Sequence, residues 1–133
     1  MSFLLDTNIL SVHLRLPSGL AHRFFQYSGR LSTTSVVLGE LFVWAYNRPD
    51  PSIVLKAIDE LLLQEVSVLD FDRDCANVFG RIRIELRRRG IDVPSVDLMI
   101  ASAALVYDLT LVTHNTADFR NIPGLRLEDW LTP

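Results

Sequence analysis

The sequence predicts an α/β fold in which a short, mainly parallel sheet is flanked by helices in a three-layer arrangement. Short apolar runs recur along the chain, segments with helical spacing of apolar residues separate them, and no repeat or flexible linker interrupts the alternation. Strands that alternate with helices are typical of a parallel sheet with helices on both faces. Because the chain has 133 residues, 49% of them hydrophobic, residues 1–133 are expected to form a single domain around one core.

The apolar runs are too short for helices and are interpreted as buried strands. In order, they lie at residues 3–5, 31–34, 66–69, 109–112 and 125–127. The segments between them carry apolar residues at helical spacing. Helices are expected directly after the first strand and then over residues 20–27, 36–46, 51–63, 72–89 and 96–107.

Turn and capping residues define the expected helix ends. Pro17-Ser18-Gly19 is interpreted as a turn before the second helix. Ser35 and Ser95 are expected to cap the helices that follow them. Pro51 fits the first position of a helix, and the segment from Arg87 to Gly90 supplies the cations and the glycine that end the long helix.

Charge and cysteine content narrow the possible function classes. The chain has 13 Lys and Arg against 16 Asp and Glu, and this net charge of −3 speaks against a nucleic acid as partner, because such binders usually carry a basic excess. The single Cys75 excludes an internal disulfide and fits a reducing compartment. The N-terminus does not resemble a signal peptide, and no apolar stretch approaches the roughly 20 residues of a membrane span. A cytoplasmic protein with no membrane partner is therefore expected.

Four acids lie where a parallel α/β fold places functional groups. Asp6 follows the first strand directly, and Asp118 lies in the polar loop that leaves the fourth strand. Glu40 lies within an apolar stretch of a helix, where a carboxylate needs either water or a partner. Asp97, in a first helical turn, shares a face with apolar residues. Each acid alone also fits an ordinary role as a cap, a helix-dipole partner or a solvated loop residue.

Taken together, the four acids indicate a metal site at the carboxyl ends of the strands. Clustered carboxylates repel one another, so they persist only where protons or cations compensate them. Oxygen ligands without His or Cys at metal spacing select a hard ion, Mg²⁺ or Mn²⁺. The chemistry natural to such a site is hydrolysis of a phosphodiester by a water that the metal activates.

Two other functions stay open at this point. One is an aspartyl-phosphate phosphatase with Asp6 as its nucleophile, although Asn8 stands where that chemistry usually needs a second acid. The other is a non-catalytic scaffold that binds RNA or protein. Intact acids at all four positions argue against a scaffold, because a silent site has no reason to keep carboxylates that repel one another.

A second group of residues is a candidate for RNA binding. A run of arginines could follow a phosphate backbone, and His114, in the loop after the fourth strand, could contact phosphate. The simpler interpretation is that the arginines stabilise a helix C-terminus and pair with Glu85. The arginines are Arg81, Arg83, Arg87, Arg88 and Arg89.

Several short motifs, in this order along the chain, are Leu4-Leu5-Asp6-Thr7-Asn8, Ser35 to Leu41, Asp97 to Ala101, Leu111 to Phe119, Ile122 to Leu125 and Glu128 to Trp130. Together they resemble the PIN-domain ribonucleases of the VapC toxin type, from VapBC toxin–antitoxin pairs. The resemblance runs from residue 4 to residue 130. It implies a PIN fold and a Mg²⁺- or Mn²⁺-dependent endoribonuclease that acts on structured RNA such as tRNA or rRNA.

The resemblance also implies roles for individual residues. Asp6, Glu40 and Asp97 match the family's acidic core, and Asp118 matches its more variable fourth acid, so the four would be both catalytic residues and metal ligands. The supporting polar residues would be Thr7, Asn8, Thr113 and Asn115. Many members carry an acid where this chain has Asn115.

The partners implied by the resemblance are RNA, a second copy of the chain in a homodimer, and a VapB-like antitoxin whose C-terminal segment lies across the site. The apolar stripes of the helices at 36–46 and 53–63 would suit such a segment, or would simply pack on each other. If the four acids belong to a metal site, 12 acids remain against 13 Lys and Arg, and the net charge no longer excludes RNA.

Overall fold

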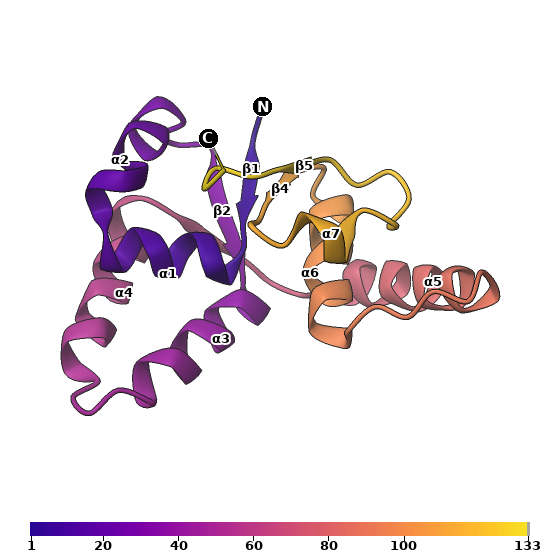
Figure 1. Cartoon of the computed structure of the whole chain (residues 1–133), viewed down its shortest axis with the longest axis horizontal. Helices are drawn as coiled ribbons and strands as arrows, with labels where there is room; N and C mark the ends of the chain where they lie inside the picture. Colours follow the sequence, from indigo (N-terminus) through magenta and orange to yellow (C-terminus); the bar gives the residue numbers. More distant parts are fainter. Residues whose placement is uncertain (133) are drawn as a thin grey trace.

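The structure, a computed structural model, describes residues 1–132 and confirms the predicted α/β fold with a parallel sheet (Figure 1). All pairings in its five-stranded sheet are parallel, in the spatial order β3-β2-β1-β4-β5. The strands are β1 (Phe3–Leu5), β2 (Leu31–Thr34), β3 (Ser67–Leu69), β4 (Thr110–Val112) and β5 (Leu127–Glu128). Their hydrophobic side chains form the centre of the core, and β1 and β4 are buried along their whole length.

Seven helices connect and flank the strands. In the view of Figure 1, the first four lie on one side of the central strands and the last three on the other. The helices are α1 (Thr7–Arg15), α2 (Pro17–Gln26), α3 (Ser35–Tyr46), α4 (Ser52–Gln64), α5 (Arg73–Arg88), α6 (Ser95–Val106) and α7 (Thr116–Phe119). None of the helices within residues 1–132 is long and apolar enough to cross a membrane.

The strand order creates one natural place for a site. From β1 the chain builds outward through β2 to β3, and it then returns to the other side of β1 to add β4 and β5. Ligands in such sheets bind beyond the carboxyl ends of the strands where the order reverses. That point is the end of β1, where the backbone N–H of Asp6 donates to the carbonyl of Val112, 3.0 Å away, and so extends the pairing with β4.

Three element boundaries differ from the prediction. Residues 17–19 are the first turn of α2 rather than a separate turn, because Pro17 occupies the start of the helix, where its missing N–H costs nothing. The segment after β4 was expected to be a loop throughout, but residues 116–119 form the short helix α7. The last strand lies at residues 127–128 instead of 125–127, in register with Leu111 and Val112.

The expected caps are also displaced by one residue. Thr34, not Ser35, caps α3, because its side-chain oxygen accepts from the N–H of Val37 at 3.0 Å. Pro51 occupies the N-cap position of α4 rather than its first helical position. Ser95 is the first residue of α6 instead of its cap, and α6 has no side-chain cap at all.

The apolar stripes of α3 and α4 only partly pack on the core. Each helix buries two or three residues and leaves large apolar side chains in solvent. The exposed ones are Val43, Tyr46, Ile53 and Leu63. These helices therefore offer apolar surface to a partner, as well as packing on the core.

An aromatic cluster holds the C-terminal segment against the start of the chain. The Trp130 ring stacks on Tyr27, with centroids 5.7 Å apart, and meets Phe3 and Phe24 edge-on at 5.2 and 6.4 Å. The guanidinium of Arg23 lies 5.6 Å from the centre of the Trp130 ring. Packing of this kind ties the last strand region to β1 and α2.

Candidate active site

Asp6 lies at the centre of the site and is almost completely buried. It ends β1, and its two carboxylate oxygens accept from the N–H of Thr7 and from the hydroxyl of Thr113, each at 2.7 Å. Only 5% of its surface is exposed. Burial raises the pKa of Asp6, the two hydrogen bonds oppose this change, and the nearby charge of Glu40 adds to it. Asp6 does cap α1, as one interpretation of the sequence expected, yet a cap gains nothing from burial next to another acid.

Glu40 reaches the site from the middle of α3. Its side chain is half-buried, and the hydroxyl of Thr7 donates to its Oε1 at 2.5 Å. The buried face of α3 consists of Val37, Leu41 and Ala45, so Glu40 lies at the edge of that face and not within it. The carboxylate thus has both of the compensations that the sequence left open, a hydrogen-bond partner and access to water.

Asp97 carries the strongest electrostatic signal in the site. It lies in the first turn of α6 and is half-buried, while its neighbours on the same helix face are buried. Burial, and the negative charges of Asp6, Asp118 and Glu40, raise the pKa of Asp97 to about 6. Like charges act in this way only over short distances, so the pKa of Asp97 reports that all four acids share one region.

Asp118 is the most exposed of the four acids. It lies in α7, and its backbone N–H donates to the carbonyl of Asn115 at 3.0 Å. Its charge acts on Asp97 from the side of the site that faces solvent. Asp118 and Asp97 therefore approach each other from α7 and α6, two helices that pack together.

A hydrogen-bonded network of polar side chains joins β1 to the loop after β4. The buried Thr113 hydroxyl donates to Asp6 and accepts from the N–H of Asn115 at 3.1 Å and from the amide of Asn8 at 3.4 Å. The amide oxygen of Asn8 accepts from the N–H of His114 at 3.1 Å. Thr113 and Asn8 thus fix the loop that leads to Asp118, whereas the side chain of Asn115 is exposed.

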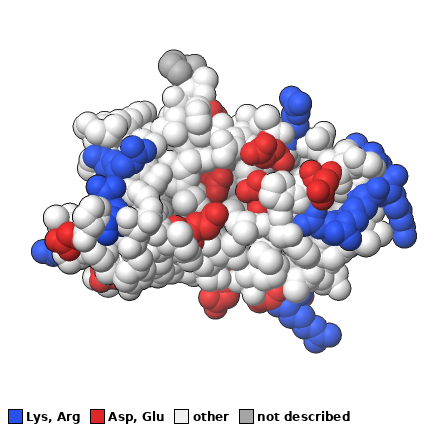
Figure 2. All heavy atoms as spheres, turned by 60° about the horizontal axis from the view of Figure 1, so that its bottom comes forward, with Lys and Arg blue, Asp and Glu red and all other residues white. Residues whose placement is uncertain are grey.

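The acids give the site a clear charge pattern. Figure 2 shows acidic side chains gathered in the middle of the face that lies at the bottom of Figure 1, with basic side chains at both ends. All ligand atoms that the four acids offer are carboxylate oxygens, the donor set of Mg²⁺ and Mn²⁺. Within residues 1–132, no three His, Cys, Asp or Glu side chains form a preformed metal cage. Mutual repulsion keeps uncompensated carboxylates apart, so the donor set fits a hard ion while its spacing fits the uncompensated state.

The candidate RNA-binding residues fall into two groups. Arg81, Arg87 and Arg88 are exposed on α5, and none of them forms an ion pair within the described chain. The expected pairing of Glu85 with an arginine is absent from the same residues. His114 is exposed beside the site, and its Nδ1 lies 3.1 Å from a carboxylate oxygen of Asp129.

Arg83 does not belong with these exposed arginines. Only 8% of its surface is exposed, and its guanidinium bonds to the segment before α6. The interpretation of Arg83 as part of a phosphate-binding run is therefore wrong, because its cation faces the protein. Sequence alone could not separate it from its neighbours, although its spacing from Ile82 and Leu86 on the buried side of α5 is a weak signal.

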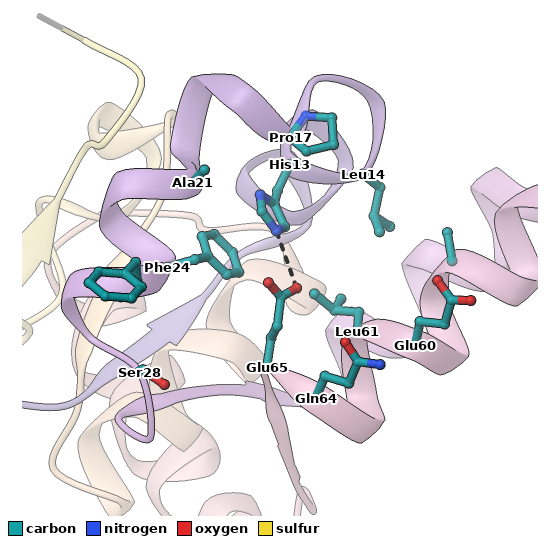
Figure 3. Close-up of a pocket in the computed structure, with 12 residues that line it drawn as sticks. His13, Leu14, Pro17, Ala21, Phe24, Ser28, Glu60, Leu61, Gln64 and Glu65 are labelled. Carbon is teal, nitrogen blue, oxygen red and sulfur yellow. Dashed lines mark hydrogen bonds and ion pairs between the residues drawn. The ribbon is translucent and has the colours of Figure 1, made fainter.

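A separate pocket, which the sequence did not indicate, lies between α1, α2 and α4 (Figure 3). It has a volume of about 490 Å³ and mixes apolar side chains such as Phe24 and Leu61 with the acids Glu60 and Glu65. His13 forms one wall, stacked on Phe24 at 3.6 Å and 3.3 Å from Glu65. None of the four site acids lines this pocket, so it is not the acidic site.

Comparisons with known proteins agree with this geometry. The PIN domain family matches residues 3–125. The chain is 38% identical over 131 residues to the tRNA(fMet)-specific endonuclease VapC of Shigella flexneri, with 98% of each chain covered. It is 31% identical over 132 residues to ribonuclease VapC2 of Haemophilus influenzae, with 98% of this chain and 99% of the relative covered.

Solved structures give the same result. The fold matches a chain in the crystal structure of DNA-bound VapBC from Salmonella typhimurium with a TM-score of 0.91 and 35% identity, over 98% of each chain. It matches a chain in VapBC2 from Rickettsia felis with a TM-score of 0.89 and 29% identity, over 98% of this chain and 99% of the other. The motifs, the parallel sheet and these matches agree along nearly the whole chain, which therefore belongs to the PIN-domain family and, within it, to the VapC ribonucleases of VapBC toxin–antitoxin systems.

Proposed function

We propose that this ribonuclease is a Mg²⁺- or Mn²⁺-dependent endonuclease that hydrolyses phosphodiester bonds in tRNA, with Asp6, Glu40, Asp97 and Asp118 as its catalytic metal ligands. The observation that carries the proposal is the raised pKa of Asp97, to about 6, under the charges of the other three acids. A fold keeps such repulsion only if a cation relieves it in use. Neither the phosphatase nor the silent scaffold has a comparable observation in its favour.

The residues of the site divide the work of the reaction. A bound Mg²⁺ or Mn²⁺ supplies a more acidic water for attack on phosphorus, and positive charge next to the phosphate. Thr113 orients the Asp6 carboxylate through its 2.7 Å hydrogen bond, and Thr7 orients Glu40 in the same way. The oriented oxygens face a common point, which is the contribution that a protein makes to such a site. No side chain of the chain needs to form a covalent bond to the substrate.

The substrate class follows from the relatives and from the surface. Two of them, from Shigella flexneri and Salmonella typhimurium, are named tRNA(fMet)-specific endonucleases and are 38% and 37% identical to this chain. The exposed arginines 81, 87 and 88 on α5 form a basic end beside the acids (Figure 2), suited to the backbone of a folded RNA. His114, exposed at the rim, would contact a phosphate next to the cleaved bond.

The experiment that tests this function compares the protein with Asp6→Asn on purified tRNA. Cleavage in the presence of Mg²⁺ or Mn²⁺ is expected for the wild type and for Asp59→Asn, a matched change of an exposed acid on α4. No cleavage is expected for Asp6→Asn or for the wild type in EDTA. Equal cleavage in all four samples would refute the proposed metal site, and cleavage of rRNA but not tRNA would refute the proposed substrate.

The neighbours in VapBC complexes support an antitoxin as the partner of this chain. We place a VapB-like antitoxin on the apolar surface of α3 and α4 and in the pocket beside α4, where an amphipathic helix with basic residues would meet apolar and acidic side chains. Leu63→Asp, at an exposed position, is expected to weaken the complex without changing cleavage by the free toxin. An unchanged affinity would remove α4 from the interface.

We also propose that the chain acts as a homodimer. Light scattering on the purified toxin, free of its antitoxin, measures this mass directly. A mass near 30 kDa, twice the 15.1 kDa of one chain, is expected. A mass of one chain at micromolar concentration would contradict the proposal.

A further inference from the structure

Arg83 is a buried cation that joins two helices at one end of the acidic site. It lies on α5 with 8% of its surface exposed, and its guanidinium lies 5.4 Å from the centre of the Phe79 ring. One nitrogen, Nη1, donates to the carbonyl of Val93 at 2.6 Å, and the other, Nη2, donates to the hydroxyl of Ser95 at 3.0 Å. The planar fork of arginine is the side chain that can bind both acceptors at once.

The only acid that Arg83 contacts within residues 1–132 is a weak partner. Asp92 lies 3.4 Å away, and its side chain is 93% exposed. An exposed ion pair of this kind contributes little free energy. The two bonds to Val93 and Ser95 therefore account for the place of the cation, and neutralisation of a charge does not.

The end of α6 that Arg83 holds has no cap of its own. Pro94 is the N-cap residue and forms no side-chain hydrogen bond, and Ser95 gives its hydroxyl to Arg83 instead of to the backbone. Helix N-termini usually depend on such a cap for their stability. The first turn of α6 is thus fixed from outside, by a side chain of α5.

That first turn carries Asp97, two residues after Ser95. The carboxylates of Asp6, Glu40 and Asp118 repel Asp97, and the repulsion acts to move the turn away from the site. Because the turn lacks a cap, a second restraint is needed to hold Asp97 near the other three acids.

We propose that Arg83 is a positioning residue for Asp97, and that its bonds to Val93 and Ser95 hold the first turn of α6 in place for metal binding. The effect on metal rests on the proposed function, whereas the restraint on α6 does not. Arg83 makes no contact with substrate in this role. It differs from the exposed arginines of α5, which would act on RNA.

The test uses Arg83→Lys and Ser95→Ala, with Leu86→Ala as the matched control. Lysine keeps the charge but cannot bind both acceptors, and Ser95→Ala removes one acceptor at an exposed position. Leu86 is fully buried on the same helix, so its truncation lowers stability without touching the segment before α6. Two quantities are measured: Mn²⁺ affinity by calorimetry, and hydrogen exchange of the Leu98 amide, which donates to Pro94 in the first turn.

Arg83→Lys is expected to weaken Mn²⁺ binding roughly tenfold, as loss of an outer-shell partner does, and to speed exchange of the Leu98 amide. Ser95→Ala should change both quantities in the same direction by less. Leu86→Ala should lower the melting temperature and leave Mn²⁺ affinity unchanged. Arg83→Lys with wild-type affinity and wild-type exchange would overturn the proposal, and so would Ser95→Ala alone if the arginine variant fails to fold.

Failure of the proposed function would look different. If the wild type neither binds Mn²⁺ nor cleaves RNA, the metal site itself is refuted. Faster exchange of Leu98 in Arg83→Lys but not in Leu86→Ala would still show the restraint on α6 in that case. Equal exchange in all variants would refute the restraint whatever the metal does.

Discussion

The substitution Asp97→Asn should stabilise the metal-free protein at neutral pH and remove its response to metal. The pKa of Asp97 is raised from 3.8 to about 6 by burial and by three neighbouring acids, so the ionised carboxylate is unfavourable in the folded state. A change of this size corresponds to about 3 kcal/mol at most. Solvent screening at a half-exposed site reduces this value to about 1–2 kcal/mol. Loss of the favourable interaction with the helix N-terminus costs about 0.5 kcal/mol, which leaves a net gain of about 1 kcal/mol.

The sign of the pH dependence follows from the direction of the pKa change. Because the folded-state pKa of Asp97 lies above its unfolded value, its contribution to stability is present below pH 3.8 and is lost as the pH rises through about 6. The unfolding free energy of the metal-free wild type should therefore fall across this range relative to that of Asp97→Asn. Above the range, the two proteins should differ by a constant amount.

Urea unfolding in EDTA between pH 4 and 8 measures this difference, and melting temperatures with and without Mg²⁺ measure the response to metal. The variant should melt roughly 4 °C above the wild type in EDTA. Only the wild type should gain stability when Mg²⁺ is added. Asp59→Asn on α4 controls for the loss of a surface charge. If Asp97→Asn is less stable than the wild type at pH 8 in EDTA, the argument that the acids repel one another is refuted.

Three further predictions follow from the described contacts. Thr113→Val removes the hydroxyl that binds Asp6 and should lower the cleavage rate about 10- to 100-fold, whereas Thr113→Ser should retain most of it; equal rates would exclude an orienting role. Alanine at both Arg87 and Arg88 should weaken tRNA binding and reduce the slope of log affinity against log salt by about 1 per lost phosphate contact, with Lys56→Ala on α4 as the control. Trp130→Ala should lower the free energy of unfolding by about 3–5 kcal/mol, and a loss below 1 kcal/mol in urea titrations would show that the aromatic cluster is not a major contact.

Much of the fold could be predicted because the sequence is locally consistent. The runs at residues 3–5 and 31–34 are strands with the predicted bounds, since short apolar segments with polar ends have few other stable uses. The acids were recognisable for the opposite reason: Glu40 and Asp97 interrupt apolar patterns, and such interruptions need a compensating partner. Their roles as metal ligands stay predictions.

What the sequence could not supply depends on contacts between distant residues. Arg83 looks like its exposed neighbours on α5, and only the packing of α5 on α6 turns its guanidinium toward Val93 and Ser95. Thr34 and Ser35 are equally good caps in a sequence, and the choice between them depends on where β2 ends. The pocket beside His13 is formed by three helices, so no single segment could have indicated it.

The central position of β1 has a consequence for the order in which the toxin becomes active. β1 pairs with β4, whose residues lie more than 100 positions later, and Thr113 at the end of β4 holds Asp6 in place. A growing chain on the ribosome carries Asp6 from the start, but this edge of the sheet can close only when synthesis is nearly finished. Until then the acids that would cut RNA are spread along an incomplete fold. The cell therefore meets the nuclease only as a finished molecule, and an antitoxin has the whole period of its synthesis in which to be present.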